Sequence, residues 1–191
     1  MHNIYGFYKN IRDAAWRALL DFGCDSLPIE LSDICNKLGV VLLDNTTAQE
    51  LHPTESGVAI RQNGTWYIVF DDTDTLGKQR FTVAHELGHI LLGHALKNGY
   101  YTRKSNIVKP EDETAADMFA ARLLAPSCVL WGIGATTAQQ IAAVCDISIT
   151  AARIRAERLD LLRQRNAFLI APLEREVYKQ FDDFIKNNRL H

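Results

Sequence analysis

The sequence predicts an α+β fold, in which a small antiparallel sheet has helices packed on one side and is followed by an all-helical region. Residues 57–70 form two strand-like runs joined through Asn63-Gly64, a dipeptide favoured in two-residue hairpin turns because the backbone there needs positive φ. From residue 79 onward, apolar residues recur at the three- and four-residue intervals of amphipathic helices. A sheet early in the chain and helices after it together indicate the α+β class.

The expected elements follow one another along the chain. Residues 4–22 have helical spacing, and a second helix has Pro28 near its start and Gly39 at its end. Residues 40–43 predict a short buried strand, and the polar segment 44–56 predicts a loop. Further helices are expected at roughly 79–96, 111–125, 137–145, 148–164 and 174–188. We expect two regions, a domain at 1–135 that includes the N-terminal helices and a helical subdomain at 136–191 packed on it.

The composition is that of an ordinary globular protein, with 47% hydrophobic and 23% charged residues. A formal charge of −2 gives no general reason to expect binding to nucleic acid or membranes. The four cysteines form no C-x-x-C pair, which favours free thiols in a reducing compartment. Because the N-terminus lacks the apolar core of a signal peptide and no run reaches the ~20 apolar residues of a membrane span, we expect a cytoplasmic protein.

The segment RFTVAHELGHILLGH, residues 80–94, places three histidines and a glutamate in an apolar stretch. At about 100° per residue in a helix, His85 and His89 are about 40° apart on one face and can bind one metal ion together. Glu86 lies beside them, so the segment has the form H-E-x-x-H, two zinc ligands with a carboxylate that activates water. His94 is expected to point about 140° away from His89 for as long as the helix continues.

Motifs of this length also arise by chance, so the surroundings of H-E-x-x-H decide how it is interpreted. The motif lies among apolar residues, where unpaired histidine and glutamate side chains would carry a desolvation cost of several kcal/mol. Gly88, between the two histidines, leaves room for a sheet or a substrate backbone to approach. Both features favour a metal site.

A third metal ligand must come from elsewhere, because catalytic zinc usually has three protein ligands and one open position. The next expected helix offers Glu113 and Asp117, one turn apart. We choose Glu113 as the ligand, and Asp117 as the hydrogen-bond partner of the second ring nitrogen of one histidine. Glu111 remains the alternative ligand, although residue 115, one turn on, is alanine and offers no acidic partner.

The two segments together resemble the ImmA/IrrE family of metallo-endopeptidases, which are of the gluzincin type. The resemblance covers about residues 25–165 and implies a zincin-like core with bound Zn²⁺. The matching positions outside the H-E-x-x-H residues are Arg80, Phe81, Thr82, Ala84, Glu113, Ala116, Asp117, Phe119, Ala120, Ala121, Leu123, Leu124 and Pro126.

The motif and the resemblance together imply hydrolysis of peptide bonds, with zinc held by His85, His89 and Glu113. Glu86 would take a proton from water as general base and later deliver it to the leaving amine. Such a site also needs a donor that stabilises the oxyanion. The candidate donors between the two motifs are Tyr100, Tyr101 and His94, and a packing role is favoured for each of them.

The C-terminal region contains a segment, residues 136–159, that resembles a helix-turn-helix. Thr137 is expected to cap the first helix, and Ser148 to cap the second after a turn at 146–148. Packing or substrate docking is favoured over DNA binding, because the second helix also carries apolar residues and the chain is not basic. The candidate phosphate-contacting residues are Arg153, Arg155 and Arg158.

The resemblance further implies a regulatory protease with a narrow range of substrates. Family members are associated with cleaving or inactivating helix-turn-helix repressors of mobile elements or stress responses, so the expected partner is such a repressor. The alternative is a regulatory protein that binds a repressor or DNA through its C-terminal helices without cutting. Glu86 argues against this alternative, because a protein that only binds has no need of a general base. No oligomeric state is predicted.

Overall fold

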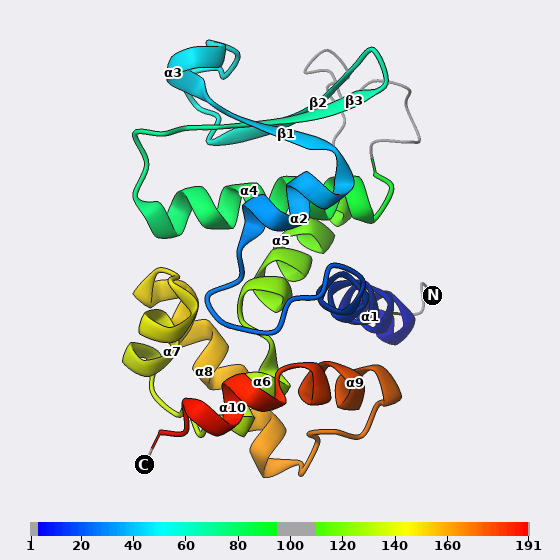
Figure 1. The fold of residues 1–191 in the computed structure, drawn as a ribbon, viewed down its shortest axis with the longest axis vertical. Coiled ribbons are helices and arrows are strands. Elements are labelled where there is room, and N and C mark those ends of the chain that lie inside the picture. Colours follow the sequence, from blue (N-terminus) through cyan, green and yellow to red (C-terminus); the bar gives the residue numbers. More distant parts are fainter. Residues whose placement is uncertain (1–3, 95–109, 191) are drawn as a thin grey trace. The chain divides into compact units, whose positions relative to one another are not determined.

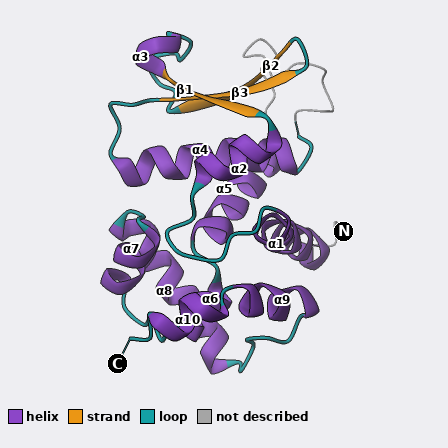
Figure 2. Ribbon diagram, viewed as in Figure 1, coloured by secondary structure: helices purple, strands orange, loops and turns teal. Residues whose placement is uncertain are grey.

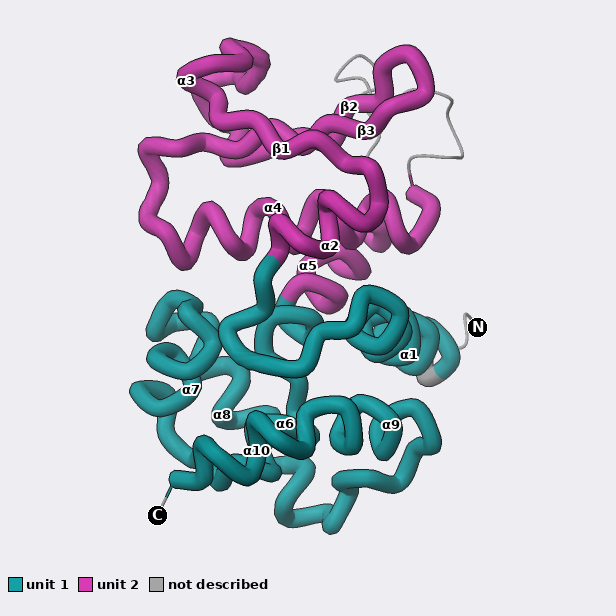
Figure 3. The backbone as a smooth tube through the Cα atoms, in the orientation of Figure 1, with its two compact units in different colours: residues 1–30, 121–191 teal, residues 31–120 magenta. Residues whose placement is uncertain are grey.

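The computed structural model describes residues 4–94 and 110–190, and the chain divides into two compact units (Figure 3). Unit 2 comprises residues 31–120, and unit 1 comprises residues 1–30 with 121–191. These bounds differ from those of the two regions expected from the sequence, whose division at residue 135 stays a prediction. In the described part of the chain, no helix combines the length and the apolar character that a membrane span requires.

Unit 2 contains the sheet, three helices that contact it and the start of a fourth helix (Figure 2). Together with the helices of unit 1, this composition confirms the α+β class. The elements are α2 (Leu31–Leu38), β1 (Val40–Asp44), α3 (Asn45–Ala48), β2 (Gly57–Gln62), β3 (Thr65–Phe70), α4 (Leu76–Leu91) and α5 (Pro110–Leu124), which continues into unit 1.

The sheet has the strand order β1-β3-β2 and is mixed. Strands β2 and β3 form the predicted antiparallel hairpin, whose turn residues Asn63 and Gly64 have φ of 50° and 86°. Strand β1 lies on the other side of β3 and runs parallel to it. The prediction of a purely antiparallel sheet is therefore wrong. The hairpin signal is local and specifies only one neighbour of β3, whereas the pairing of β1 depends on distant residues.

Helices α2 and α4 cover one face of the sheet, as predicted (Figure 1). Helix α4 packs on β2 and β3, and α2 packs on β1 and α4. Ile68 and Val69 of β3 and Leu87 of α4 are fully buried. The connection 44–56 was predicted as a loop but contains the single-turn helix α3, because the side chain of Asp44 accepts a hydrogen bond from the backbone N–H of Thr47 and caps it.

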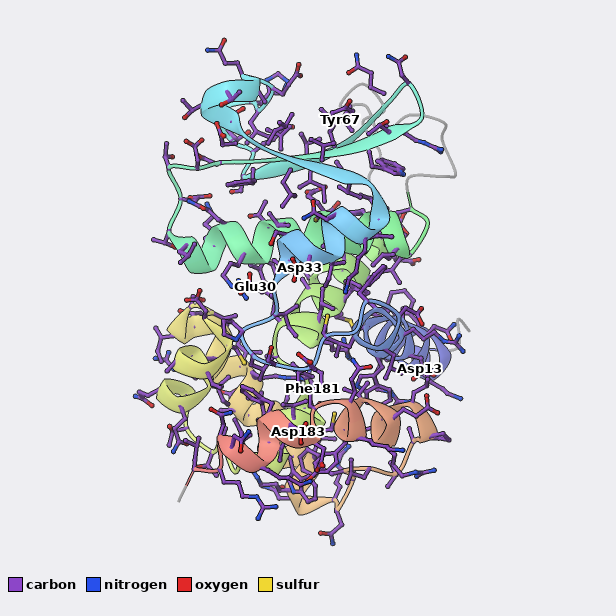
Figure 4. All side chains as sticks on the ribbon, viewed as in Figure 1. Asp13, Glu30, Asp33, Tyr67, Phe181 and Asp183 are labelled. Carbon is purple, nitrogen blue, oxygen red and sulfur yellow. The ribbon has the colours of Figure 1, made fainter. Side chains whose placement is uncertain are left out.

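In the described residues of unit 1, the regular elements are all helices. Helix α1 packs against α9, which also packs against α6. One helix was expected at 174–188, but the chain forms two that meet at Phe181 (Figure 4). The side chain of Phe181 is fully buried. The sequence prediction also missed the short α6. The elements are α1 (Ile4–Asp21), α6 (Ser127–Gly132), α7 (Ala138–Cys145), α8 (Ile149–Gln164), α9 (Pro172–Gln180) and α10 (Asp182–Asn187).

The predicted caps of α7 and α8 are confirmed. Thr137 accepts from the backbone N–H of Gln140, whose side chain accepts in return from the backbone N–H of Thr137, which completes a capping box. Ser148 accepts from the backbone N–H of Ala151 at the start of α8. Asp146, between the helices, has φ of 53° and ends α7. The helix-turn-helix character of this pair stays a prediction.

Candidate metal centre

Helix α4 brings His85 and His89 together at one point. They are one helical turn apart, and their Nε2 atoms are separated by 2.9 Å. The side chain of His89 is 2% exposed and that of His85 is 15% exposed, so the two rings line a site at the edge of the unit 2 core. The geometry follows from helix periodicity, because residues i and i+4 lie on the same face.

Helix α5 adds Glu113 to the two histidines. Its Oε2 atom lies 3.2 Å from Nε2 of His85, and its Oε1 atom lies 3.2 Å from Nε2 of His89. One atom from each of the three residues lies within 4.8 Å of the others, so the group could hold a metal ion. The structure thus brings together the three residues predicted as ligands. Glu111, the alternative, is exposed.

The charges in this cluster favour an ionised glutamate beside protonated histidine in the metal-free chain. Burial opposes protonation of His85, but hydrogen bonds with Asp117 and Glu113 outweigh it and raise the pKa of His85 to about 10. The hydrogen bonds with His85 and His89 hold the pKa of Glu113 well below its usual range. A divalent cation would replace the proton here and keep the electrostatic balance.

Asp117 lies where a histidine-orienting carboxylate was expected. Its Oδ1 atom is 2.8 Å from Nδ1 of His85, the ring nitrogen that faces away from Glu113. A carboxylate at this position accepts the Nδ1–H proton and leaves the lone pair on Nε2. The contact therefore selects the tautomer in which Nε2 of His85 can bind a metal.

Glu86 lies on the side of α4 that faces the sheet and is 7% exposed. The backbone N–H of Ala59 in β2 donates a hydrogen bond to its carboxylate. Burial raises the pKa of Glu86, against the opposing effect of the nearby His89 and His85. A buried carboxyl group with a raised pKa beside a candidate metal site is suited to accept and return a proton.

Gly88 allows α4 and α5 to approach closely. A Cβ atom at this position would lie 3.1 Å from Cδ1 of Phe119, 3.2 Å from Cα of Ala116 and 3.3 Å from its carbonyl oxygen. The sequence prediction that a sheet or a substrate would approach Gly88 is wrong, because helix α5 occupies this space. This close approach brings Glu113 within reach of both histidines.

The sequence predicted that His94 would point away from the site, but in the structure it lies against His89. Helix α4 ends at Leu91 rather than at residue 96, and Gly93 takes φ of 74°, which turns the chain back. Nδ1 of His94 lies 3.1 Å from Nδ1 of His89, and its Nε2 lies 3.6 Å from Oδ1 of Asp112.

These contacts engage both ring nitrogens of His94 and give no support to a role as oxyanion donor. The other two candidate donors, Tyr100 and Tyr101, lie outside the described residues. The sequence interpretation missed Asp112 and the contact of His94. Gly93 was the available signal, since glycine commonly ends a helix in this conformation.

The three arginines proposed as nucleic-acid contacts have different environments. Arg153 and Arg158 are exposed. Arg155 instead donates from Nε to the carbonyl of Ala125 at 2.6 Å and from a terminal nitrogen to the hydroxyl of Ser127 at 3.0 Å. Burial, and then the charge of Arg122, lowers its pKa to about 10. Arg155 therefore contributes to packing within unit 1.

Comparison with protein families gives a match that spans the whole candidate site. The IrrE N-terminal-like domain of the Peptidase_M78 family matches residues 35–157. This range includes both histidines of α4, Glu86 and the acidic residues of α5, and it agrees with the resemblance noted in the sequence. A comparison with curated proteins found no match. A match over well more than half of the sequence shows that the chain belongs to the Peptidase_M78 family, whose name implies a peptidase.

Proposed function

We propose that the chain is a zinc endopeptidase whose metal is held by His85, His89 and Glu113. The convergence of their donor atoms carries the proposal. A tetrahedron with metal–ligand bonds of about 2.05 Å has edges of about 3.3 Å. The three donor–donor distances of 2.9, 3.2 and 3.2 Å are close to this value, so small side-chain adjustments suffice to accommodate the ion.

The donor types support zinc over other common cations. Two imidazole nitrogens and one carboxylate form a set typical of catalytic zinc, with a fourth position left for water or substrate. Calcium and magnesium prefer sites made of oxygen ligands only. The buried position of His89 adds to this argument, because a bound cation offsets the free-energy cost of burying its imidazole ring.

The residues around the ligands have distinct roles in the proposed reaction. When bound, zinc supplies a Lewis acid for the scissile carbonyl and for water. Glu86 accepts the proton of the attacking water and returns it to the leaving amine, which its raised pKa favours. Asp117 holds Nδ1 of His85 in its protonated form and keeps the ring in place.

We further propose that the substrate is a helix-turn-helix repressor of a mobile element or stress response. The family resemblance supports this substrate class, and the capped α7–α8 pair offers a helical surface that could dock it. The alternative is a protein that binds the repressor or DNA without cutting. A cleavage assay distinguishes this alternative from the proposed endopeptidase, because binding alone leaves the repressor intact.

The experiment uses the full chain with the helix-turn-helix regulator encoded beside it, with zinc and with chelator. We expect the wild type to cleave the regulator only with zinc. Glu86→Gln is expected to bind zinc normally and to lose cleavage, whereas Glu111→Gln, an equivalent change at an exposed position on α5, is expected to cleave normally. Full cleavage by Glu86→Gln would refute the role of Glu86, and an intact regulator with zinc-loaded wild type would favour the alternative.

A further inference from the structure

His94 is the one histidine of the segment 80–94 that the proposed ligand set does not use. It follows the end of α4, where its backbone N–H donates to the carbonyl of His89 at 3.1 Å. Its side chain is 9% exposed, and its ring packs edge-on against that of His89, with centroids 5.2 Å apart and planes at 70°. The positive φ of Gly93 produces this return, so the ring is held by backbone geometry and burial together.

The two ring nitrogens of His94 face different partners. Nδ1 lies 3.1 Å from Nδ1 of His89, and Nε2 lies 3.6 Å from Oδ1 of Asp112. Asp112 lies on α5 directly before Glu113, so the same helix that supplies the proposed ligand also supplies this carboxylate. The groups therefore form a continuous series from the carboxylate of Asp112 through two imidazole rings to the metal-facing Nε2 of His89.

One arrangement of protons satisfies every contact in this series. If Nε2 of His89 binds a metal, the ring proton of His89 must lie on its Nδ1 atom. This Nδ1–H then donates to Nδ1 of His94. Nδ1 of His94 must accept, so its ring proton lies on Nε2, which faces the acceptor oxygen of Asp112. Each donor then faces an acceptor, and the lone pair of His89 points toward Glu113.

We propose that Asp112 and His94 act as positioning residues that fix the tautomer and orientation of His89 for metal binding, an inference that rests on the proposed zinc site. They do for His89 what Asp117 does directly for His85. The intervening ring has a physical reason. His89 is almost fully buried, and a carboxylate placed directly against its Nδ1 would be desolvated at high cost, whereas His94 links it to a carboxylate that is 26% exposed.

The experiment compares zinc affinity among variants of the full chain, measured by competition with a chromophoric chelator. His94→Phe keeps a ring but removes the acceptor, and we expect it to lower zinc affinity about 10- to 100-fold. His94→Gln offers a carbonyl acceptor and should recover most of this loss. Asp112→Asn removes the charge and should lower affinity about tenfold. His52→Gln, at an exposed position in the same unit, is the control and should bind like the wild type.

Two further readouts separate positioning from packing. The absorption spectrum of the Co²⁺-substituted protein reports ligand geometry, and we expect it to change in His94→Phe and to return in His94→Gln. The thermal midpoint of the metal-free protein should not follow the order of zinc affinities. If His94→Phe binds zinc as tightly as the wild type does, the inference is overturned, but the proposed function still stands because the wild type binds zinc. Failure of Gln to recover affinity also overturns it, and absence of zinc binding in the wild type overturns both.

Discussion

A single methyl group at Gly88 tests whether the approach of α5 to α4 sets the geometry of the metal centre. In Gly88→Ala, the added Cβ would lie 3.1–3.3 Å from three atoms of α5, against an ordinary contact distance of about 3.5 Å. The contacts are therefore too short by about 0.2–0.4 Å. Two of these atoms belong to the backbone of Ala116, so side-chain rotation alone does not relieve them and α5 must move.

Two effects of opposite sign determine the stability of Gly88→Ala. Replacing glycine by alanine inside a helix contributes about 1 kcal/mol of stability through helix propensity. Overpacking in a filled core costs about 1–3 kcal/mol. The contacts with backbone atoms favour the upper part of this range, so we expect a net loss of about 1–2 kcal/mol and a thermal midpoint lower by about 2–8 °C.

The displacement of α5 also moves Glu113 relative to the two histidines. A functional site must be held within about 0.5 Å of its working geometry, and a shift of about 0.4 Å approaches that limit. We expect zinc affinity to fall about tenfold, measured by chelator competition, with unfolding of the metal-free protein followed in urea. A raised midpoint with unchanged zinc affinity is the result that helix propensity alone would give, and it would refute this account of Gly88.

Three further predictions concern pH, a second glycine and unit 1. Because the pKa of His85 is raised from 6.5 to about 10, its contribution to stability is present below pH 6.5 and is lost as pH rises through 10. The zinc-free protein should therefore unfold at a lower urea concentration at pH 9.5 than at pH 6.5. Gly57→Ala places a Cβ 2.2 Å from the methyl group of Thr82 and should destabilise the fold by about 1–3 kcal/mol, measured by thermal unfolding. The double variant Gly57→Ala, Thr82→Ser lacks that methyl group and should recover the lost stability. Arg155→Met should cost about 1–3 kcal/mol of stability because the carbonyl of Ala125 loses its donor, and it should leave zinc affinity unchanged by chelator competition.

The parts of the site that the sequence predicted are those that depend on helix periodicity. The separation of His85 from His89, and of Glu113 from Asp117, is one turn in each case, and one turn is fixed by backbone geometry whatever the rest of the fold does. The hairpin turn at Asn63-Gly64 and the caps of α7 and α8 are equally local, which is why they could be predicted. The need of catalytic zinc for a third ligand, and then the family resemblance, suggested that the two pairs meet, because spacing alone does not bring two helices together.

The parts that could not be predicted depend on where elements end and what they meet. His94 was expected to point away because the apolar pattern of α4 runs on to residue 96, whereas Gly93 ends the helix early. The parallel pairing of β1 joins residues about 26 positions apart, as in the register of Val40 with Trp66, and no local signal specifies it. In both cases the missing information was a non-local contact or a helix end, and both are weakly encoded in periodicity.

The arrangement of α5 explains why the H-E-x-x-H segment alone is an incomplete signal for a metal centre. Asp112, Glu113 and Asp117 each face one histidine or two, so one helix supplies the proposed ligand and the two carboxylates that we propose to orient the histidines. The contacts of Glu113 and Asp117 depend on the distance between α4 and α5, and the contact of Asp112 depends also on the turn of the chain at Gly93. Gly88 and the backbone of Ala116 set that distance. A search for such sites should accordingly require a small residue between the two histidines, together with an alanine three residues after the acidic ligand, because this pair permits the carboxylates to reach the rings.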